Sequence, residues 1–351
     1  TIYQYAFAYI ENLTTLELPA SLDSLGSYVF LGCGALSEVT LNGNWDGSFS
    51  GSGPSFSKIA YGAVLYVNNK EDFWPYFSSE FSIITEKGDL FEKGGIRYNV
   101  LDGNSVAIVS AKAANVYTGD FVVPETVVYS GKTYNVTRIS GKAFLDCTEL
   151  TGIKIHDKIE SICDEAFLNC SSLEEVKFPN SLTEICNGAF RNCSSLKDVV
   201  FPSSIKSIGY SAFRDCTSLT HVTIPSGLDY LDSHTLEGCT ALTSVVANTL
   251  SQSIFVRCTN LKGVELKDGI TSIPQGAFNG CASLTGIDLP NSLTSLAWSS
   301  FSGCSSLERI TIPANVSELG EHVFSNCTSL VEVTSEAVAP PMAATNTFMG
   351  I

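Results

Sequence analysis

The sequence predicts a repeat solenoid of the α/β type, and three observations carry this expectation. One phrase of 23 residues recurs between Gly141 and Val246. Within the phrase, phenylalanine, cysteine and leucine each keep one fixed position. The second half of the phrase alternates apolar and other residues, as a strand with one buried face does. A unit this short cannot bury its own apolar side, so the copies are expected to stack on one another.

The repeated residues fall into three columns that extend to the end of the chain. The phenylalanine column is Phe144, Phe167, Phe190, Phe213, Leu236, Phe255, Phe278, Phe301, Phe324 and Phe348. The cysteine column is Cys147, Cys170, Cys193, Cys216, Cys239, Cys258, Cys281, Cys304 and Cys327. The leucine column is Leu150, Leu173, Leu196, Leu219, Leu242, Leu261, Leu284, Leu307 and Leu330. We expect these columns to form continuous ladders inside the molecule.

Each copy is predicted to contain one strand and one return segment. The Leu-x-x-Val-x-Ile phrase predicts parallel strands on the concave side of a leucine-rich repeat array. Prolines close the strands because proline has no N–H to donate to the next turn; they are Pro179, Pro202, Pro225, Pro290 and Pro313. The Ala-Phe segment is expected to return along the other side through short turns or helical segments.

The full phrase, I-x-x-x-A-F-x-x-C-x-x-L-x-x-V-x-I-P, resembles the BspA-like subclass of leucine-rich repeats. Such repeats occur on surface and secreted proteins of bacteria, and the resemblance covers nearly the whole chain. It implies a curved solenoid with an adhesive or protein-binding role and an extracytoplasmic location, on the cell surface or secreted. It brings no catalytic motif.

The net charge disfavours nucleic acids and anionic membranes as partners, and the hydropathy gives no sign of a membrane span. The 36 acidic and 20 basic residues give a net charge of −16, which repels nucleic acid phosphates and anionic membranes. No run of 18 apolar residues occurs, so no membrane span is expected. The chain opens within a repeat, and we expect any export signal to lie upstream.

The twelve cysteines divide into two groups. Ten of them, counting Cys33, keep the repeat phase and are interpreted as small buried thiols. Cys163 and Cys186 share a second position and should lie about 5 Å apart on neighbouring turns. A disulfide between them stays open as an alternative, although parallel neighbours in register rarely meet the required torsion.

Three domains are expected along the chain. Residues 1–86 would be the end of a first array with its C-terminal cap, 87–137 a β-rich N-terminal cap, and 138–351 the main array. Aromatic residues crowd the end of the first array: Phe73, Trp74, Tyr76, Phe77 and Phe81. They favour a cap over the open end, with a stacking platform for a ligand as the alternative. The chain stops where the first array enters its cap, so a further capping segment is expected beyond Ile351.

One copy departs from the period. From Leu236 to Phe255 the spacing is 19 residues, and the missing piece is the Pro-x-x-Leu turn after the strand. The shorter return path is expected to change the local curvature or leave a notch.

Residues suited to catalysis are sparse. The four histidines, His156, His221, His234 and His322, form no metal-binding motif. A cysteine repeated in every copy does not suit a single nucleophile. The glycine-rich residues 47–53 lack the Lys-Ser/Thr of a phosphate loop. We therefore expect no enzymatic activity, no cofactor and no metal.

The outward positions of the strands supply the candidate binding surface. At its centre we expect an apolar to neutral patch with a charged rim, which suits a protein interface; its residues are Lys177, Asp198, Val200, His221, Thr223 and Val246. The alternative is that Val and Thr occur there only because they favour strands.

The sequence thus predicts a non-enzymatic protein of adhesion type that binds a protein partner, such as a host or matrix protein. Two other functions stay open. One is a carbohydrate-binding surface component that stacks sugar rings on the aromatic cluster or on Trp45 and Trp298. The other is a structural spacer.

Overall fold

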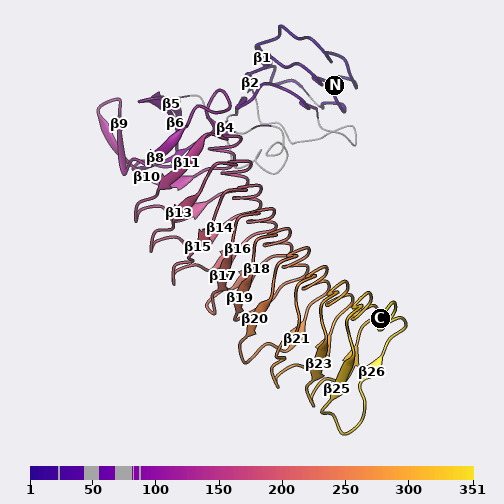
Figure 1. Cartoon of the computed structure of the whole chain (residues 1–351). Coiled ribbons are helices and arrows are strands. Elements are labelled where there is room, and N and C mark those ends of the chain that lie inside the picture. The colour runs from indigo at the N-terminus through magenta and orange to yellow at the C-terminus, as the bar shows by residue number, and fades with distance from the viewer. Residues whose placement is uncertain (23, 43–54, 68–80, 82, 87) are drawn as a thin grey trace. The chain divides into compact units, whose positions relative to one another are not determined.

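The computed structural model of the chain describes residues 1–22, 24–42, 55–67, 81, 83–86 and 88–351 (Figure 1). The chain forms two compact units. The first unit consists of Thr1–Val116 and Pro124–Phe144, and the second consists of Tyr117–Val123 and Leu145–Ile351. The division into domains 1–86, 87–137 and 138–351 stays a prediction.

The first unit contains a short parallel array followed by hairpins. Its strands are β1 (Thr15–Leu18), β2 (Glu38–Leu41), β3 (Val64–Tyr66), β4 (Ile83–Thr85), β5 (Leu90–Lys93), β6 (Ile96–Val100), β7 (Ser105–Ile108), β9 (Thr126–Tyr129) and β10 (Lys132–Ile139). The first four pair in parallel in the order β1-β2-β3-β4. Strands β5, β6 and β7 pair antiparallel, β7 pairs with β10 in parallel, and β9 folds back on β10.

Stacked phenylalanines fill the array of the first unit. The ring of Phe30 lies 5.5 Å from that of Phe7 and 5.0 Å from that of Phe56. Phe81, from the aromatic segment of the sequence, is fully buried and packs its edge on Phe56. The buried Arg97 of β6 donates from Nη1 to the carbonyls of Gly62 at 3.2 Å and Ser110 at 3.0 Å. These bonds fix the hairpins against the array.

The second unit is a β-solenoid with two lines of short parallel strands. The strands are β8 (Gly119–Val122), β11 (Leu150–Lys154), β12 (Ser161–Ile162), β13 (Glu175–Lys177), β14 (Glu184–Ile185), β15 (Asp198–Val199), β16 (Ser207–Ile208), β17 (His221–Ile224), β18 (Tyr230–Leu231), β19 (Ser244–Ala247), β20 (Gly263–Leu266), β21 (Ser272–Ile273), β22 (Ser295–Leu296), β23 (Arg309–Ile312), β24 (Glu318–Leu319), β25 (Glu332–Ser335) and β26 (Met342–Ala343). One line runs β8-β11-β13-β15-β17-β19-β20 and continues separately as β23-β25 (Figure 1). The other runs β12-β14-β16-β18 and then β21-β22-β24-β26. The first line was expected from the sequence, and the second was not.

The three predicted columns form the core of the second unit. Phe190 stacks between Phe167 and Phe213, with ring centroids 4.9 and 5.2 Å apart and planes within 6° and 5° of parallel. The Cys193 thiol donates to the Phe167 carbonyl at 3.2 Å, and the same bond recurs along the cysteine column. Each fully buried phenylalanine or leucine contributes about 1.5 to 3 kcal/mol. The columns therefore contribute substantially to the stability of the second unit.

The α/β class is wrong, because the described residues contain no helix; of the two alternatives for the return segments, short turns or helical segments, the turns are present. The return segments are runs of turns. In the copy around Phe167, alternate amides bond to the next copy: Phe167 N–H donates to the Ala189 carbonyl at 2.7 Å and Asn169 N–H to the Arg191 carbonyl at 3.0 Å. Asn169 also has a left-handed φ of 63°. Amides directed along the solenoid axis cannot form the successive bonds of a helix.

The short copy interrupts the second line of strands. β18 ends one sheet and β21 begins the next, and residues 248–252 between them form no strand. The four missing residues correspond to the Pro-x-x-Leu turn that precedes this strand in the regular copies, such as Pro225 to Leu228 before β18. The first line is interrupted one copy later, at 285–289. Each line of strands is thus interrupted, at staggered positions, and the change in curvature or notch expected at the short copy stays a prediction.

Candidate functional site

The outward side chains of β13, β15, β17 and β19 form one surface, called the strand face below. Asp198 lies opposite Glu175 and His221, and Thr223 lies opposite Val246. All six residues predicted for binding lie on the strand face: Lys177, Asp198, Val200, His221, Thr223 and Val246. Five of them are exposed and Val246 is half-buried.

The centre of the strand face is apolar. Val200 follows β15 and is 80 % exposed, whereas the preceding Val199 is 6 % exposed and belongs to the core. Thr223 and Val246 continue the same row on the next two strands. Covering the isopropyl group of Val200 with a partner is favourable by about 25 cal/mol per Å² of apolar surface removed from water.

Charged residues border this centre on one side. The Lys177 ammonium lies 3.2 Å from a Glu175 carboxylate oxygen, and Lys197 lies 2.6 Å from Glu174. These pairs are exposed and contribute little to stability. They give the rim charges of both signs, which affect association and orientation more than affinity.

His221 is linked to the strand beside it. Its Nδ1 lies 2.8 Å from Ser244 Oγ, and the two residues are opposite each other in register. This bond ties the imidazole ring to Ser244, within the row of outward side chains that contains Asp198.

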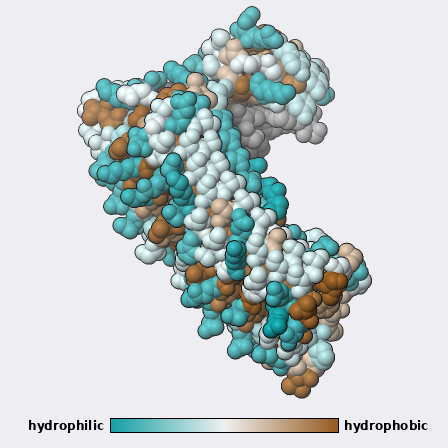
Figure 2. Space-filling model, in the orientation of Figure 1, coloured by the Kyte–Doolittle hydropathy of each residue, from teal (hydrophilic) through white to brown (hydrophobic). Residues whose placement is uncertain are grey.

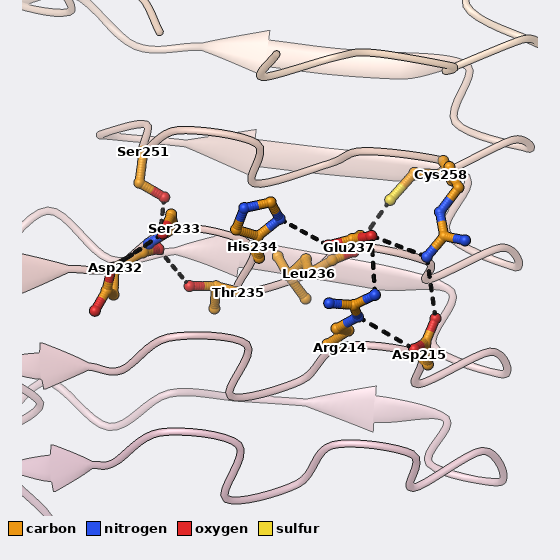
Figure 3. A network of polar contacts seen from close by, with 11 residues as sticks. Arg214, Asp215, Asp232, Ser233, His234, Thr235, Leu236, Glu237, Ser251 and Cys258 are labelled. Atoms are coloured by element: carbon orange, nitrogen blue, oxygen red, sulfur yellow. Dashed lines mark hydrogen bonds and ion pairs between the residues drawn. The ribbon is translucent and has the colours of Figure 1, made fainter. Parts of the chain in front are cut away.

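A second polar cluster, which the sequence reasoning missed, lies in the short copy (Figure 3). Glu237 is 7 % exposed and binds three partners. Its Oε1 accepts from Arg257 Nη2 at 2.9 Å and lies 3.3 Å from Arg214 Nη2, while Oε2 lies 2.7 Å from His234 Nδ1. Arg214 also lies 3.4 Å from an Asp215 carboxylate oxygen. We name these five residues the Glu237 cluster.

The repeat itself brings the cluster together. Arg214 stands one copy before Glu237, directly after the column phenylalanine, so the two side chains are neighbours on adjacent turns. Arg257 stands only 20 residues after Glu237 because the copy is short. Beside the cluster, the Asp232 carbonyl accepts from the hydroxyls of Thr235 and Ser251, both at 2.7 Å (Figure 3). A comparison of the charges at equivalent positions of adjacent copies could have found the pair of Arg214 and Glu237.

The Glu237 cluster has the geometry of a structural brace. Two guanidinium groups neutralise one buried carboxylate, and paired charges of this kind are the form in which buried ions persist. The carboxylate is already bonded on both oxygens and does not point into a cavity described by the structure. We assign it no part in chemistry.

The cysteine column is chemically inert. Burial raises the pKa of the Cys258 thiol to about 12, and the same cause raises the pKa values of Cys193 and Cys216. A thiol that stays protonated is a weak nucleophile. Within the described ranges, no group of three or more His, Cys, Asp or Glu side chains is placed to hold a metal ion.

Among the cavities lined by described residues, one in each unit opens beside parallel strands. One, of about 460 Å³, is lined in the first unit by residues that include Glu17, Glu38 and Tyr66. The other, of about 360 Å³, lies in the second unit where the strands are interrupted, beside Asp288 and Arg309. Neither is lined by the residues predicted for binding.

The aromatic residues predicted as a stacking platform for a ligand differ in where they lie. Phe73, Trp74, Tyr76 and Phe77 lie outside the described residues, as does Trp45. Phe81 belongs to the core and is not available to a ligand. Trp298 is 48 % exposed on a return segment.

The face of the molecule in Figure 2 shows hydrophobic surface in separate patches among hydrophilic residues. Across the described ranges, none of the structure is a helix with the length and apolar character needed to cross a bilayer.

Comparison with known proteins identifies the repeat. The pattern described as "BspA type Leucine rich repeat region" matches in six copies, over residues 1–53, 137–253 and 248–339. No curated protein matches the chain.

Solved structures of bacterial leucine-rich repeat proteins are similar to it. A leucine-rich cell surface protein of Faecalibacterium prausnitzii is 22% identical over 70% of this chain and 94% of that chain, with a TM-score of 0.33. The leucine-rich repeat protein of T. pallidum is 22% identical over 69% and 90%, with a TM-score of 0.42. The pneumococcal vaccine antigen PcpA is 24% identical over 71% and 82%, with a TM-score of 0.47. Because the family pattern spans most of the sequence, the chain belongs to the family of BspA-type leucine-rich repeat proteins.

Proposed function

We propose that this chain is a non-enzymatic binding protein outside the cytoplasm, on the cell surface or secreted, and that its strand face binds a protein partner such as a host or matrix protein. The family membership supports a surface role, and a relative with this repeat is itself described as a cell surface protein. The observation that carries the proposal is Val200, which is 80 % exposed at the centre of the strand face.

The strand face suits a protein partner in shape and rigidity. It is built on consecutive hydrogen-bonded strands, so its side chains need little reordering on binding. Its apolar centre with a charged rim matches the arrangement of many protein interfaces. The net charge of −16 favours partners with basic surfaces over nucleic acids or anionic membranes.

The test is binding of the purified chain to an array of extracellular matrix and serum proteins, with Val200→Asp and Val246→Asp as variants. A charge placed in the apolar centre should lower binding at least tenfold, because the carboxylate would have to be desolvated in the interface. Val200→Asp should melt within about 2 °C of the parent, since Val200 is exposed and surface substitutions change stability by under about 0.5 kcal/mol.

Thr183→Asp is the matched control, because it adds the same charge at an exposed residue beside the other line of strands. It should bind as the parent does. If the two valine variants bind the same array protein as strongly as the parent, the strand face is not the binding surface.

A carbohydrate-binding function is the second candidate, since Trp298 presents a half-exposed indole ring. A glycan array distinguishes the two functions. Binding to a glycan that Trp298→Ala removes and Val200→Asp leaves intact would favour the carbohydrate function.

A further inference from the structure

Cys163 and Cys186 lie side by side on neighbouring turns of the second unit. Each is the first residue after a strand, and the two strands pair with Ile162 opposite Ile185. The Cys186 N–H donates to the Ile162 carbonyl at 2.9 Å. Neighbouring strands are about 4.8 Å apart. This spacing falls within the Cα separations of roughly 4.4 to 6.8 Å that disulfides span.

The pair differs from the cysteine column in surroundings. Column thiols are fully buried and donate to phenylalanine carbonyls, as Cys193 and Cys216 do. Cys163 and Cys186 are half-buried, and their thiols share a hydrogen bond with each other. Both residues lie beyond the regular strand, at the start of a turn. Residues within two parallel strands in register rarely reach the torsion that a disulfide requires. This restriction is therefore weaker for Cys163 and Cys186.

Acidic residues surround the pair. The hydrogen bond with Cys163, burial, and the charges of Cys163, Glu184 and Asp164 raise the pKa of the Cys186 thiol well above its usual range. The raised pKa keeps the Cys186 thiol protonated at neutral pH. The two carboxylates repel anionic oxidants and attract cationic ones.

We propose that Cys163 and Cys186 form a thiol–disulfide site that neutral or cationic disulfides oxidise. The Cys163 sulfur, having lost its proton to water, attacks one sulfur of the oxidant and releases one oxidant thiol. This step leaves a mixed disulfide on Cys163. The Cys186 sulfur then loses its proton and attacks Cys163, releasing the second oxidant thiol. The protein loses two hydrogens, and the oxidant's disulfide is reduced to two thiols.

The test exposes the folded, reduced chain to cystamine, a cationic disulfide, and maps its peptides without reduction. We expect a product lighter by two hydrogens, with the Cys163 and Cys186 peptides joined. Two of the twelve thiols should be lost, and the ten column thiols should react only after denaturation. Oxidised glutathione, which is anionic, should react at least several-fold more slowly at low salt, and added salt should narrow the difference.

Two variants separate the steps. Cys186→Ser should stop at a cysteamine adduct on Cys163, and Cys163→Ser should give no linked product. The proposal is overturned if the parent chain accumulates adducts on both residues without linking them. It is also overturned if column cysteines react as fast as this pair.

Discussion

Glu237 shows how one buried charge is balanced in this fold. Its two oxygens are bonded to Arg214, Arg257 and His234, so the cost of removing the carboxylate from water is offset by three partners. The sequence did not reveal the cluster, because its members are 23, 20 and three residues apart and no common motif joins them. They become neighbours because adjacent copies stack in register and because the short copy places Arg257 only 20 residues after Glu237.

Replacing Glu237 by Gln should lower the free energy of unfolding by about 2 to 3 kcal/mol. The amide has nearly the same size, but it removes the carboxylate that Arg214 and Arg257 share, so these two guanidinium groups are left with Asp215 as their carboxylate partner. Glu332→Gln is the control, because Glu332 pairs with Arg309 at 3.5 Å where both side chains are exposed, and should cost under about 1 kcal/mol. Urea unfolding measures both values, and equal losses would contradict the role of Glu237 as a brace.

The cysteine column should make the fold sensitive to alkali. The Cys258 pKa is about 12 in the folded chain and 9.0 for an ordinary cysteine. Above pH 9 the unfolded chain loses the proton and the folded chain keeps it, so stability falls as pH rises from about 9 to 12. Each such thiol contributes a slope of about 1.4 kcal/mol per pH unit.

Urea unfolding midpoints between pH 8 and pH 10.5 measure the slope of the free energy of unfolding against pH. Cys258→Ala should reduce this slope by the contribution of one thiol. An unchanged pH dependence in this variant would mean that Cys258 ionises equally in the folded and unfolded chain.

The repeated turn is the element on which the fold is built. Its strand and its columns could be predicted, because they depend on alternation and on the fixed places of large apolar residues. Its return segment could not. Ala-Phe segments suit a helix as well as a turn, and bonds to the next copy decide between the two. The second line of strands was missed for a related reason: two-residue strands such as β14 and β16 carry no periodic signal.

The left-handed corner of each turn can be tested at two glycines. Gly238 and Gly280 occupy the same position with φ values of 75° and 73°. An added Cβ at Gly280 would lie 3.6 Å from its nearest neighbour, whereas at Gly238 it would lie 2.1 Å from Asp215 Oδ1.

Gly280→Ala should therefore lower the free energy of unfolding by about 1 to 2 kcal/mol, the cost of the left-handed conformation. Gly238→Ala should cost more, because Asp215 must also move away from Arg214. Thermal and urea unfolding of the two variants give the comparison. A Gly238→Ala variant that is no less stable than Gly280→Ala would show that Asp215 moves without cost.

At the scale of the whole molecule, the period of 23 residues predicted the family and the stacked core. The candidate binding surface was predicted as a set of outward positions, and register alone placed them on one face. Its ligand follows from neither the period nor the register, since the core positions determine the stacking and the outward ones are free to vary. The array of purified proteins addresses that part of the account.

The central claim is that side chains one period apart form continuous internal columns, and Phe190→Ala tests it most directly. Phe190 is fully buried between Phe167 and Phe213, so its loss opens a cavity in the middle of the column. Urea unfolding followed by circular dichroism should show a loss of about 3 to 5 kcal/mol. Val200→Ala on the exposed strand face should change stability by under about 0.5 kcal/mol. A Phe190→Ala chain as stable as the Val200→Ala chain would contradict the stacked core.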